Sequence, residues 1–241
     1  KKMRKSAIIT GASGDIGGAI ARKFASEGID LVLQYRNEEK IQNVIDSLKD
    51  YDVEILKVKE DIITYEACQE LVNKAMEKFG KIDILVNNAG RILDASTVKM
   101  SEENFKKVID LNLISVFYMT KLVGIEMLKR EQGKIVSLAS VSGIMGTYGQ
   151  CNYVASKAAV MGMTKTWARE FGRKGINVNA VAPGFIVSHM TEGLEDMYVK
   201  QIPMKRFGKV DEIANGIYFL CSDQATYIQG QTLVIDGGLT L

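Results

Sequence analysis

Three side chains near the middle of the chain could together carry out acid–base chemistry: Ser140, Tyr153 and Lys157. Tyr153 and Lys157 are four residues apart, which places them on one face of a helix, one turn apart. A free tyrosine has a pKa of about 10, and a cation one turn away favours the phenolate and lowers that pKa. Such a pair can give a proton to a carbonyl oxygen or take one from an alcohol, and the Ser140 hydroxyl could hold the same oxygen. The same spacing also occurs between ordinary helix residues, so other motifs must support this interpretation.

The spacing of apolar residues indicates the elements that must hold these side chains. Short apolar segments alternate with stretches of helical periodicity along the whole chain, which is typical of an α/β fold with a parallel sheet covered on both faces. No proline-rich linker, repeat or low-complexity tract interrupts the pattern, so residues 1–241 are predicted to form one domain. Strands are predicted at 6–10, 31–35, 54–58, 82–86, 134–138, 176–181 and 232–235, and helices at 16–27, 38–48, 65–79, 105–128, 153–171 and 210–221.

A glycine-rich turn follows the first predicted strand. The segment TGASGDIG occupies positions 10–17 and opens a helix. Glycines at such a turn let the backbone approach a pyrophosphate, and the helix N-terminus adds N–H groups and the positive end of its dipole. The location directly after the first strand therefore favours a dinucleotide site.

The end of the second predicted strand bears on the choice of nucleotide. In dinucleotide-binding folds a carboxylate about 20 residues past the glycine turn binds the ribose hydroxyls of NAD, whereas a nearby arginine accommodates the phosphate of NADP. Tyr35 stands where the acid is expected, and Arg36 follows it. A solvated surface arginine is the alternative interpretation, but the pair favours NADPH (NADP+) over NADH.

Further polar residues fall at the carboxyl ends of predicted strands, where ligands bind in parallel sheets. Asp61 follows the third predicted strand, and the fourth leads into the sequence NNAG at 87–90, which could also be a simple turn. Asn112 lies inside an apolar helical pattern, so its amide must find hydrogen-bond partners. It could be a polar residue of the core or the holder of a water in a proton relay.

Composition excludes several other classes of function. The 241 residues are 46% hydrophobic and 25% charged with a net charge of +2, which is ordinary for a globular protein and argues against nucleic acid as the main partner. Three widely spread cysteines and one histidine, His189, form no metal-ligand spacing and no disulfide framework, so no metal is expected. No segment resembles a signal peptide or a run of apolar residues as long as a membrane span, and we expect a cytoplasmic protein without a membrane partner.

With these residues collected, the sequence resembles the short-chain dehydrogenase/reductase family over essentially the whole chain. The shared features are the glycine turn at 10–17, NNAG at 87–90, Asn112, Ser140, Tyr153 with Lys157, and Pro183-Gly184 after the sixth predicted strand. The resemblance implies a Rossmann-type doubly wound parallel sheet of seven strands in the order 3-2-1-4-5-6-7, with helices on both faces.

The resemblance also implies roles for these residues in hydride transfer between a nicotinamide and a carbonyl carbon. Ser140 would orient the carbonyl, Tyr153 would deliver the proton, and Lys157 would bind the nicotinamide ribose and lower the pKa of Tyr153. Asn112 would hold the water that reloads the proton, and residues 188–205 would form a lid over the substrate. The implied cofactor-binding residues are Gly11, Ser13, Asp15, Ile16, Gly17, Arg36, Asp61, Ile62, Asn88, Ala89, Gly90, Tyr153, Lys157, Pro183, Gly184, Ile186 and Ser188.

Within the family, the segments 149–160, 178–186 and 227–238 look most like those of 3-oxoacyl-[acyl-carrier-protein] reductases. This implies NADPH-dependent reduction of a 3-oxoacyl thioester in fatty acid biosynthesis, with acyl carrier protein as a possible partner. Another ketone, secondary alcohol or sugar is the alternative substrate, and the complete set of catalytic residues argues against a cofactor sensor without turnover. The helical patterns at 105–128 and 153–171 are apolar around much of their circumference, which favours burial, and the family implies a homotetramer, with a dimer as the alternative.

Three positions depart from the family pattern. Asp15 stands where a second glycine is usual, and we expect it to point away from the cofactor as a helix cap while Gly14 gives the turn its freedom. Gly14 also lacks the basic side chain that is frequent in NADPH-dependent members. Glu131 lies in a region near the active-site entrance that is often basic in carrier-dependent reductases, and the basic residues near it that could still receive an acidic carrier are Lys129, Arg130, Arg173 and Lys174.

Overall fold

The centre of the molecule is a seven-stranded sheet in the order β3-β2-β1-β4-β5-β6-β7, which confirms the predicted order. The structure is a computed structural model that describes residues 4–193 and 195–241. All adjacent strands run parallel. The strands are β1 (Ser6–Ile9), β2 (Asp30–Tyr35), β3 (Ile55–Lys59), β4 (Ile84–Asn87), β5 (Gly133–Leu138), β6 (Ile176–Pro183) and β7 (Thr232–Ile235).

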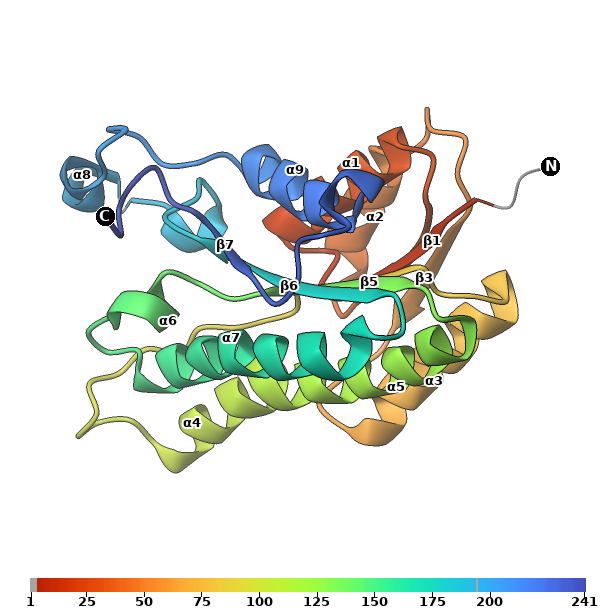
Figure 1. Ribbon diagram of the computed structural model, residues 1–241. Coiled ribbons are helices and arrows are strands. Elements are labelled where there is room, and N and C mark those ends of the chain that lie inside the picture. Colours follow the sequence, from red (N-terminus) through yellow and green to blue (C-terminus); the bar gives the residue numbers. More distant parts are fainter. Residues whose placement is uncertain (1–3, 194) are drawn as a thin grey trace.

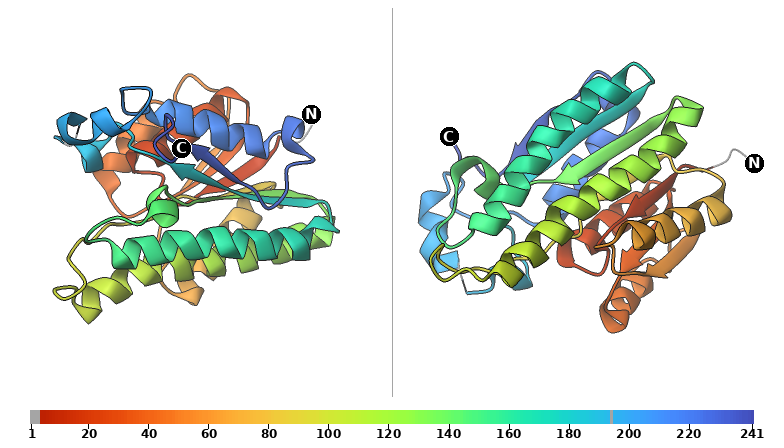
Figure 2. Two further views of the ribbon diagram at one scale, coloured as in Figure 1. Left: turned by 60° about the vertical axis from the view of Figure 1, so that its left-hand side comes forward. Right: turned by 90° about the horizontal axis from the view of Figure 1, so that it is seen from below.

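Helices cover both faces of this sheet (Figure 1). On one face lie α1 (Asp15–Ser26), α2 (Glu38–Asp46) and α9 (Val210–Cys221). On the other face lie α3 (Tyr65–Phe79), α4 (Glu102–Ile109), α5 (Ser115–Arg130) and α7 (Cys151–Gly172), and α3, α5 and α7 run side by side in the second view of Figure 2. Because both faces are covered, β1 and β2 are buried at every position, which explains their nearly continuous apolar sequences.

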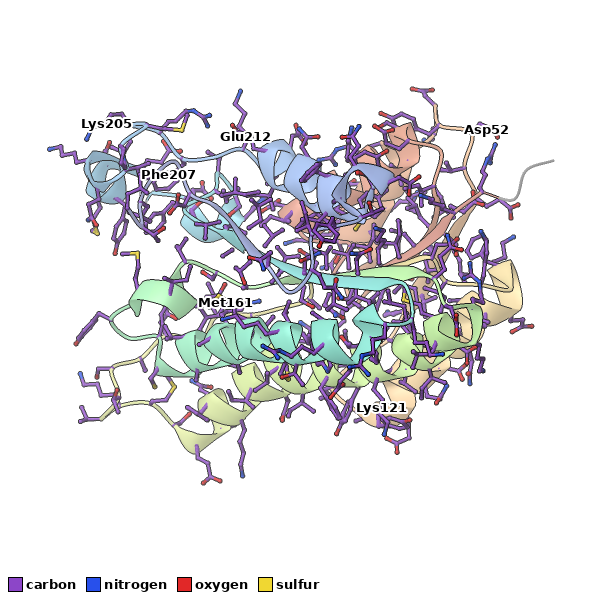
Figure 3. All side chains as sticks on the ribbon, in the orientation of Figure 1. Asp52, Lys121, Met161, Lys205, Phe207 and Glu212 are labelled. Carbon is purple, nitrogen blue, oxygen red and sulfur yellow. The ribbon has the colours of Figure 1, made fainter. Side chains whose placement is uncertain are left out.

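Two main cores fill the space between the sheet and its helices. One packs Phe24 and Ile20 of α1 with Ile217 of α9, and all three are fully buried. The other joins the sheet to α3 and α5 and includes Leu71 and Met119. A smaller cluster forms where Met161 of α7 packs against three buried alanines, Ala139, Ala180 and Ala182 (Figure 3).

The predicted helix at 105–128 is in fact three segments. α4 and α5 are joined by a turn of π-helix, η1, at Asp110–Ile114. The combined run Glu102–Arg130 is the one described helix that is long and apolar enough to cross a membrane by length and composition. A little more than half of its apolar window, 56%, is buried inside the protein, as in the core helix of a globular protein. The sequence has no uninterrupted apolar run of this length, because Asn112, Ser115 and Thr120 interrupt it.

The other predicted elements occur with ends shifted by a few residues or less. α3 and α9 have the predicted ends. For α3 the reason is local, because the Thr64 side chain accepts a hydrogen bond from Ala67 N at 3.2 Å and Gly80 ends the helix at a φ of 68°. β6 extends past its predicted end as far as Pro183.

Short helical turns lie in the loops at one end of the molecule. They are α6 (Ser142–Met145), α8 (Glu195–Tyr198), and the 3-10 turns η2 (His189–Thr191) and η3 (Val199–Gln201); a further turn, η4 (Asp223–Ala225), follows α9. α6 and α8 lie at the same end in Figure 1. The predicted lid at 188–205 contains η2, α8 and η3, and its residue 194 lies outside the described residues.

Candidate active site

The candidate site lies at the carboxyl edge of the sheet, where the strand order reverses. β1 pairs with β2 on one side and with β4 on the other. In open parallel sheets ligands bind in the crevice at such a switch point. The segments that follow β1, β2, β4, β5 and β6 all meet at this edge, and they contain most of the residues selected from the sequence.

The glycine turn after β1 is held close to the segment after β4. Gly11 has a φ of 65°, and a Cβ on it would lie 2.8 Å from Ala89 Cα. A Cβ on Gly17 would lie 2.3 Å from the Gly11 carbonyl oxygen. Only glycine fits these two positions. Gly14 has a φ of −83°, which any residue adopts, so the expectation that Gly14 supplies the freedom of the turn is wrong.

Hydrogen bonds fix the turn and the NNAG segment to each other. Thr10 Oγ1 accepts from the main-chain nitrogens of Asn88 and Ala89, both at 3.0 Å. Asn88 Nδ2 donates to the carbonyl oxygens of Thr10 and Gly11 at 3.0 and 3.1 Å. The Asn88 side chain is therefore a structural tie between two loops of the crevice.

The N-terminus of α1 offers its N–H groups to the crevice. Gly14 is the N-cap and no side-chain oxygen caps the helix within the described chain. The prediction that Asp15 caps this helix is wrong, because its carboxylate accepts a hydrogen bond from His189 N at 2.9 Å instead. Uncapped N–H groups at the positive end of a helix dipole fit a pyrophosphate.

Tyr153 and Lys157 lie one turn apart on α7, as their spacing predicts, and Ser140 lies beside Tyr153. Ser140 follows β5, and Tyr153 and Lys157 lie in the first two turns of α7. The Ser140 side chain lies close enough to the Tyr153 phenol to act on its pKa. Lys157 Nζ lies 5.6 Å from the centroid of the Tyr153 ring and donates to the Leu138 carbonyl oxygen at 2.7 Å.

The pKa of Tyr153 is raised in this structure, which contradicts the prediction that Lys157 lowers it. Burial raises the pKa, the Ser140 side chain opposes this change, and the negative charge of Asp94 raises the pKa further. Lys157 is only 4% exposed, and burial lowers its own pKa to about 8. Desolvation outweighs the attraction that the helical spacing suggested, so Tyr153 is held as the neutral phenol, the form that can donate a proton.

Asn112 is fully buried in the π-helical turn, and its amide binds the main chain of one residue. Its Oδ1 accepts from Arg91 N and its Nδ2 donates to Arg91 O, both at 2.9 Å. A Cβ on Gly90 would lie 3.5 Å from Asn112 Oδ1 and 3.7 Å from Lys157 Nζ. Asn112 thus positions the loop after β4 beside Lys157, while its part in a proton relay stays a prediction. Turns of π-helix are frequent at functional sites.

Two charged residues follow β2 and β3 at the adenosine end expected for the cofactor. Arg36 and Asp61 are both about half exposed, and Arg36 Nη1 lies 3.9 Å from Asp61 Oδ1. Ile62, which follows Asp61 in the sequence, is buried. Two further charged residues were not predicted from the sequence. Arg91 interacts through its charge with both Arg36 and Asp61, and Asp94 accepts a hydrogen bond from Gln150 Nε2 at 2.9 Å and acts through its charge on Tyr153.

The segment after β6 forms the remaining wall of the crevice. Pro183 ends β6, and Gly184 N donates to Ile235 O at 2.9 Å. A Cβ on Gly184 would lie 2.7 Å from Asp236 Cβ, so this position also requires glycine. Ile186 is buried, and Ser188 N donates to Thr191 Oγ1 at 3.1 Å.

Aromatic stacking fixes the base of the lid. The Phe185 ring lies 4.5 Å from the Tyr198 ring and 5.2 Å from the Phe207 ring, in both cases stacked. Arg206 makes two hydrogen bonds to the Glu212 carboxylate at 2.7 and 2.8 Å, and these bonds lower the pKa of Glu212 to about 2. Phe207 precedes α9 and Glu212 lies in its first turn, and both are labelled in Figure 3.

The basic residues proposed to receive a carrier lie away from this site. Lys129 and Arg130 end α5, and Arg173 and Lys174 follow α7, so all four are at the amino edge of the sheet. Arg130 Nη2 is bound to Asp83 and Lys174 Nζ to Glu131, both at 2.7 Å. α5 and α7 run antiparallel to the strands, so their C-terminal ends lie at the edge of the sheet opposite the site. The expectation that these residues lie near the active-site entrance is therefore wrong within one subunit.

Fold and site together define an oxidoreductase that uses a nicotinamide dinucleotide. The uncapped N-terminus of α1, the glycines that no larger residue can replace, and a buried Arg91 Nε without a hydrogen-bond partner among the described residues all fit such a cofactor. The catalytic assignments remain predictions that rest on this geometry.

The comparison with known proteins gives the family. Residues 11–240 match the family model described as enoyl-(acyl carrier protein) reductase, and the chain belongs to this family of short-chain dehydrogenases/reductases. A 3-oxoacyl-[acyl-carrier-protein] reductase of Staphylococcus epidermidis is 44% identical over 242 residues, which cover 98% of this chain and 99% of the relative. One from Thermotoga maritima is 42% identical over 241 residues, with 98% of each chain covered. The crystal structure of levodione reductase superposes with a TM-score of 0.94 at 33% identity, covering 97% of this chain and 96% of that one.

Proposed function

We propose that this chain is an NADPH-dependent reductase of 3-oxoacyl thioesters carried by acyl carrier protein, and that it works in fatty acid biosynthesis in the cytoplasm. The observation that carries this proposal is the interaction of the Ser140 side chain with Tyr153 beside buried Lys157, at the switch point of a chain 44% identical to such a reductase.

The side chains of the site suit the reduction of a carbonyl group. When bound, the cofactor supplies the hydride. The Ser140 hydroxyl holds the carbonyl oxygen, and the Tyr153 phenol, kept neutral by burial, gives its proton to that oxygen. The Lys157 ammonium stabilises the phenolate that remains, and Asn112 keeps the loop after β4 in place beside it.

Exposed apolar side chains near the site support an acyl substrate. Met145 of α6 and Tyr148 after it are 55% and 91% exposed, and Met197 of α8 and Met204 are 64% and 60% exposed. α6 and α8 lie at the same end of the molecule in Figure 1. Methionine side chains adapt readily to flexible apolar ligands, so this rim suits a fatty acyl chain.

The test of the substrate is an assay of NADPH oxidation with purified protein. We expect the highest kcat/KM with acetoacetyl-acyl carrier protein and a lower value with acetoacetyl coenzyme A. A crotonyl thioester, which offers a carbon–carbon double bond as the name of the family model suggests, is the contrasting substrate, and we expect it not to be reduced. Turnover of the crotonyl thioester alone would overturn the proposal.

A second candidate is the reduction of a small cyclic ketone, which the likeness to levodione reductase favours. The same assay separates the two candidates. A higher kcat/KM with levodione or cyclohexanone derivatives than with either acetoacetyl thioester would show that the apolar rim binds something other than an acyl chain.

The preference for NADPH rests on Arg36 and on the absence of an acid at Tyr35. A charge-assisted hydrogen bond contributes about 1.5 to 3 kcal/mol, so Arg36 should supply roughly 10- to 150-fold in kcat/KM for NADPH over NADH, in the low to middle part of that range because Gly14 adds no second cation. Arg36→Ala should lose most of this preference. A wild-type ratio below one, or a preference that persists unchanged in the variant, would contradict the assignment.

We also propose that the protein is a homotetramer. The outer face of α4 and α5 bears partly exposed apolar side chains, Phe105 at 38%, Phe117 at 41% and Ile125 at 43%. Lys121 of α5 points away from the sheet on the same side in Figure 3. Light scattering coupled to gel filtration should give four subunits for the wild type and fewer for Phe117→Glu.

A further inference from the structure

Arg91 directly follows the NNAG segment, and its main chain is held rigidly. Both polar atoms of the Asn112 amide bind the Arg91 main chain at 2.9 Å. The Asn112 side chain is itself fully buried. The direction in which the Arg91 side chain leaves the backbone is therefore fixed at the carboxyl end of β4.

The guanidinium of Arg91 has no bound partner in residues 4–193 and 195–241. Its Nε is buried without a hydrogen bond, and its terminal nitrogens make no hydrogen bond or ion pair within this part of the chain. Buried polar groups in folded proteins are nearly always paired. An unpartnered guanidinium N–H donor of this kind indicates a place for an acceptor that comes from outside the chain.

A second guanidinium approaches Arg91 from the other side of β1. β2 and β4 are the two neighbours of β1, and Arg36 follows β2 as Arg91 follows β4. Burial lowers the pKa of Arg91, and the positive charge of Arg36 lowers it further, whereas Asp61 and Asp110 act in the opposite direction. The two arginines therefore face the same space beside the glycine turn. The Arg36–Asp61 contact of 3.9 Å is long and half exposed, so it leaves most Arg36 donors free.

We propose that Arg91 and Arg36 together bind the 2′-phosphate of NADPH, with Arg91 as a specificity-determining residue of this chain. The inference rests on the proposed use of NADPH. A phosphate between two guanidinium groups removes their mutual repulsion and accepts several charge-assisted hydrogen bonds, including one from Arg91 Nε. Arg91 also provides the second cation of the site, which a basic side chain at position 14 would otherwise provide.

The test compares two ligands that differ only in this phosphate. Adenosine 2′,5′-bisphosphate and adenosine 5′-monophosphate are titrated by calorimetry into wild type, Arg36→Ala, Arg91→Ala and Arg91→Lys. We expect Arg91→Ala to lose at least about tenfold in affinity for the bisphosphate and less than about threefold for the monophosphate. Arg91→Lys should retain part of the difference, because it keeps the charge but not the fork of donors.

Controls separate this inference from loss of fold and from the proposed function. Arg169→Ala removes the same charge from an exposed position in the last turn of α7, and it should leave both affinities within about twofold. The thermal midpoint and circular dichroism of each variant establish that it is folded. If Arg91→Ala proves unstable, Arg91→Gln, which keeps most of the side chain, takes its place.

Three outcomes would overturn the inference. Equal losses for both nucleotides would place Arg91 on the adenosine rather than on the phosphate. An Arg91→Ala variant with wild-type affinity for the bisphosphate would show that Arg36 acts alone, and the use of NADPH would stand. A wild type that binds both ligands equally would contradict the NADPH assignment and this inference together, although 3-oxoacyl reduction with NADH would remain possible.

Discussion

The carboxylate of Asp15 binds His189 through both the main chain and the side chain. Asp15 Oδ2 accepts from His189 N at 2.9 Å, and Asp15 Oδ1 lies 3.1 Å from His189 Nδ1. Asp15 begins α1 at the phosphate turn, and His189 begins η2 in the predicted lid. This pair connects the two segments that would enclose the cofactor. The His189 side chain is 79% exposed, so the main-chain bond should contribute more than the ring.

Replacement of Asp15 by glycine tests whether its charge repels the cofactor. Because the carboxylate is engaged by His189, we expect Asp15→Gly to change cofactor affinity by less than about tenfold, or about 1.4 kcal/mol. Calorimetric titration with NADPH measures this change. His189→Ala is the matched control, since it keeps the main-chain donor and should change affinity less than Asp15→Gly. A hundredfold gain in affinity in Asp15→Gly would show that Asp15 repels the pyrophosphate.

The loss of the Tyr153 hydroxyl tests the proton donor. Tyr153→Phe keeps the ring packing and removes the phenol, so kcat should fall roughly 10²- to 10⁴-fold. Cofactor affinity, measured by fluorescence titration, should stay within a few fold of the wild type. Tyr227→Phe, which alters a fully exposed tyrosine that precedes β7 and is not part of the apolar rim, should have wild-type turnover. If Tyr153→Phe turned over like the wild type, another group would have to supply the proton.

The pH dependence of reduction should report Lys157. Burial raises the pKa of Tyr153, so the phenol stays protonated through neutral and mildly alkaline pH. Burial lowers the pKa of Lys157 to about 8, and above that pH the ammonium that stabilises the phenolate is lost. We therefore expect kcat for reduction to be level near pH 7 and to fall with an apparent pKa of about 8. A rate that stays level up to pH 9.5 would contradict this assignment.

The same buried lysine should make the stability of the protein depend on pH. In the folded state its pKa is about 8, and in the unfolded chain it returns to about 10.5. Between these values the unfolded chain binds more protons, so the contribution of Lys157 to the free energy of unfolding rises with pH, by up to about 3 kcal/mol. Urea denaturation of the wild type and Lys157→Met at pH 7, 8.5 and 10 measures this contribution as a difference. A difference that does not change with pH would mean that Lys157 has an ordinary pKa when folded.

The sequence predicted the architecture well because its signals are local. Apolar runs of strand length alternate with helical periods, and Thr64 and Gly80 mark both ends of α3. The π-helical turn at Asp110–Ile114 was not predicted, because the apolar pattern continues through it and only packing reveals the additional residue in the turn.

The sequence predicted most residues of the site, but it did not predict how burial changes their pKa values. The spacing of Tyr153 and Lys157 places them on one face, yet the pKa of Tyr153 depends on burial, which spacing does not report. Arg91 was missed because a guanidinium without a partner is recognised only in three dimensions. Lys129 and Arg130 were placed at the wrong edge of the sheet, although the direction of a helix that leads into a parallel strand could have corrected this.

The π-helical turn that carries Asn112 has a consequence for how this protein could change through evolution. A turn with i→i+5 bonds holds one residue more than the same length of α-helix. Loss of Leu113, which lies between Asn112 and α5, would leave an uninterrupted helix while rotating Asn112 by about 100° relative to α5. The loop that contains Gly90 and Arg91 would then lose the amide that holds it. A deletion at this place would therefore leave a protein that folds but does not work. A survey of point substitutions would not include this change.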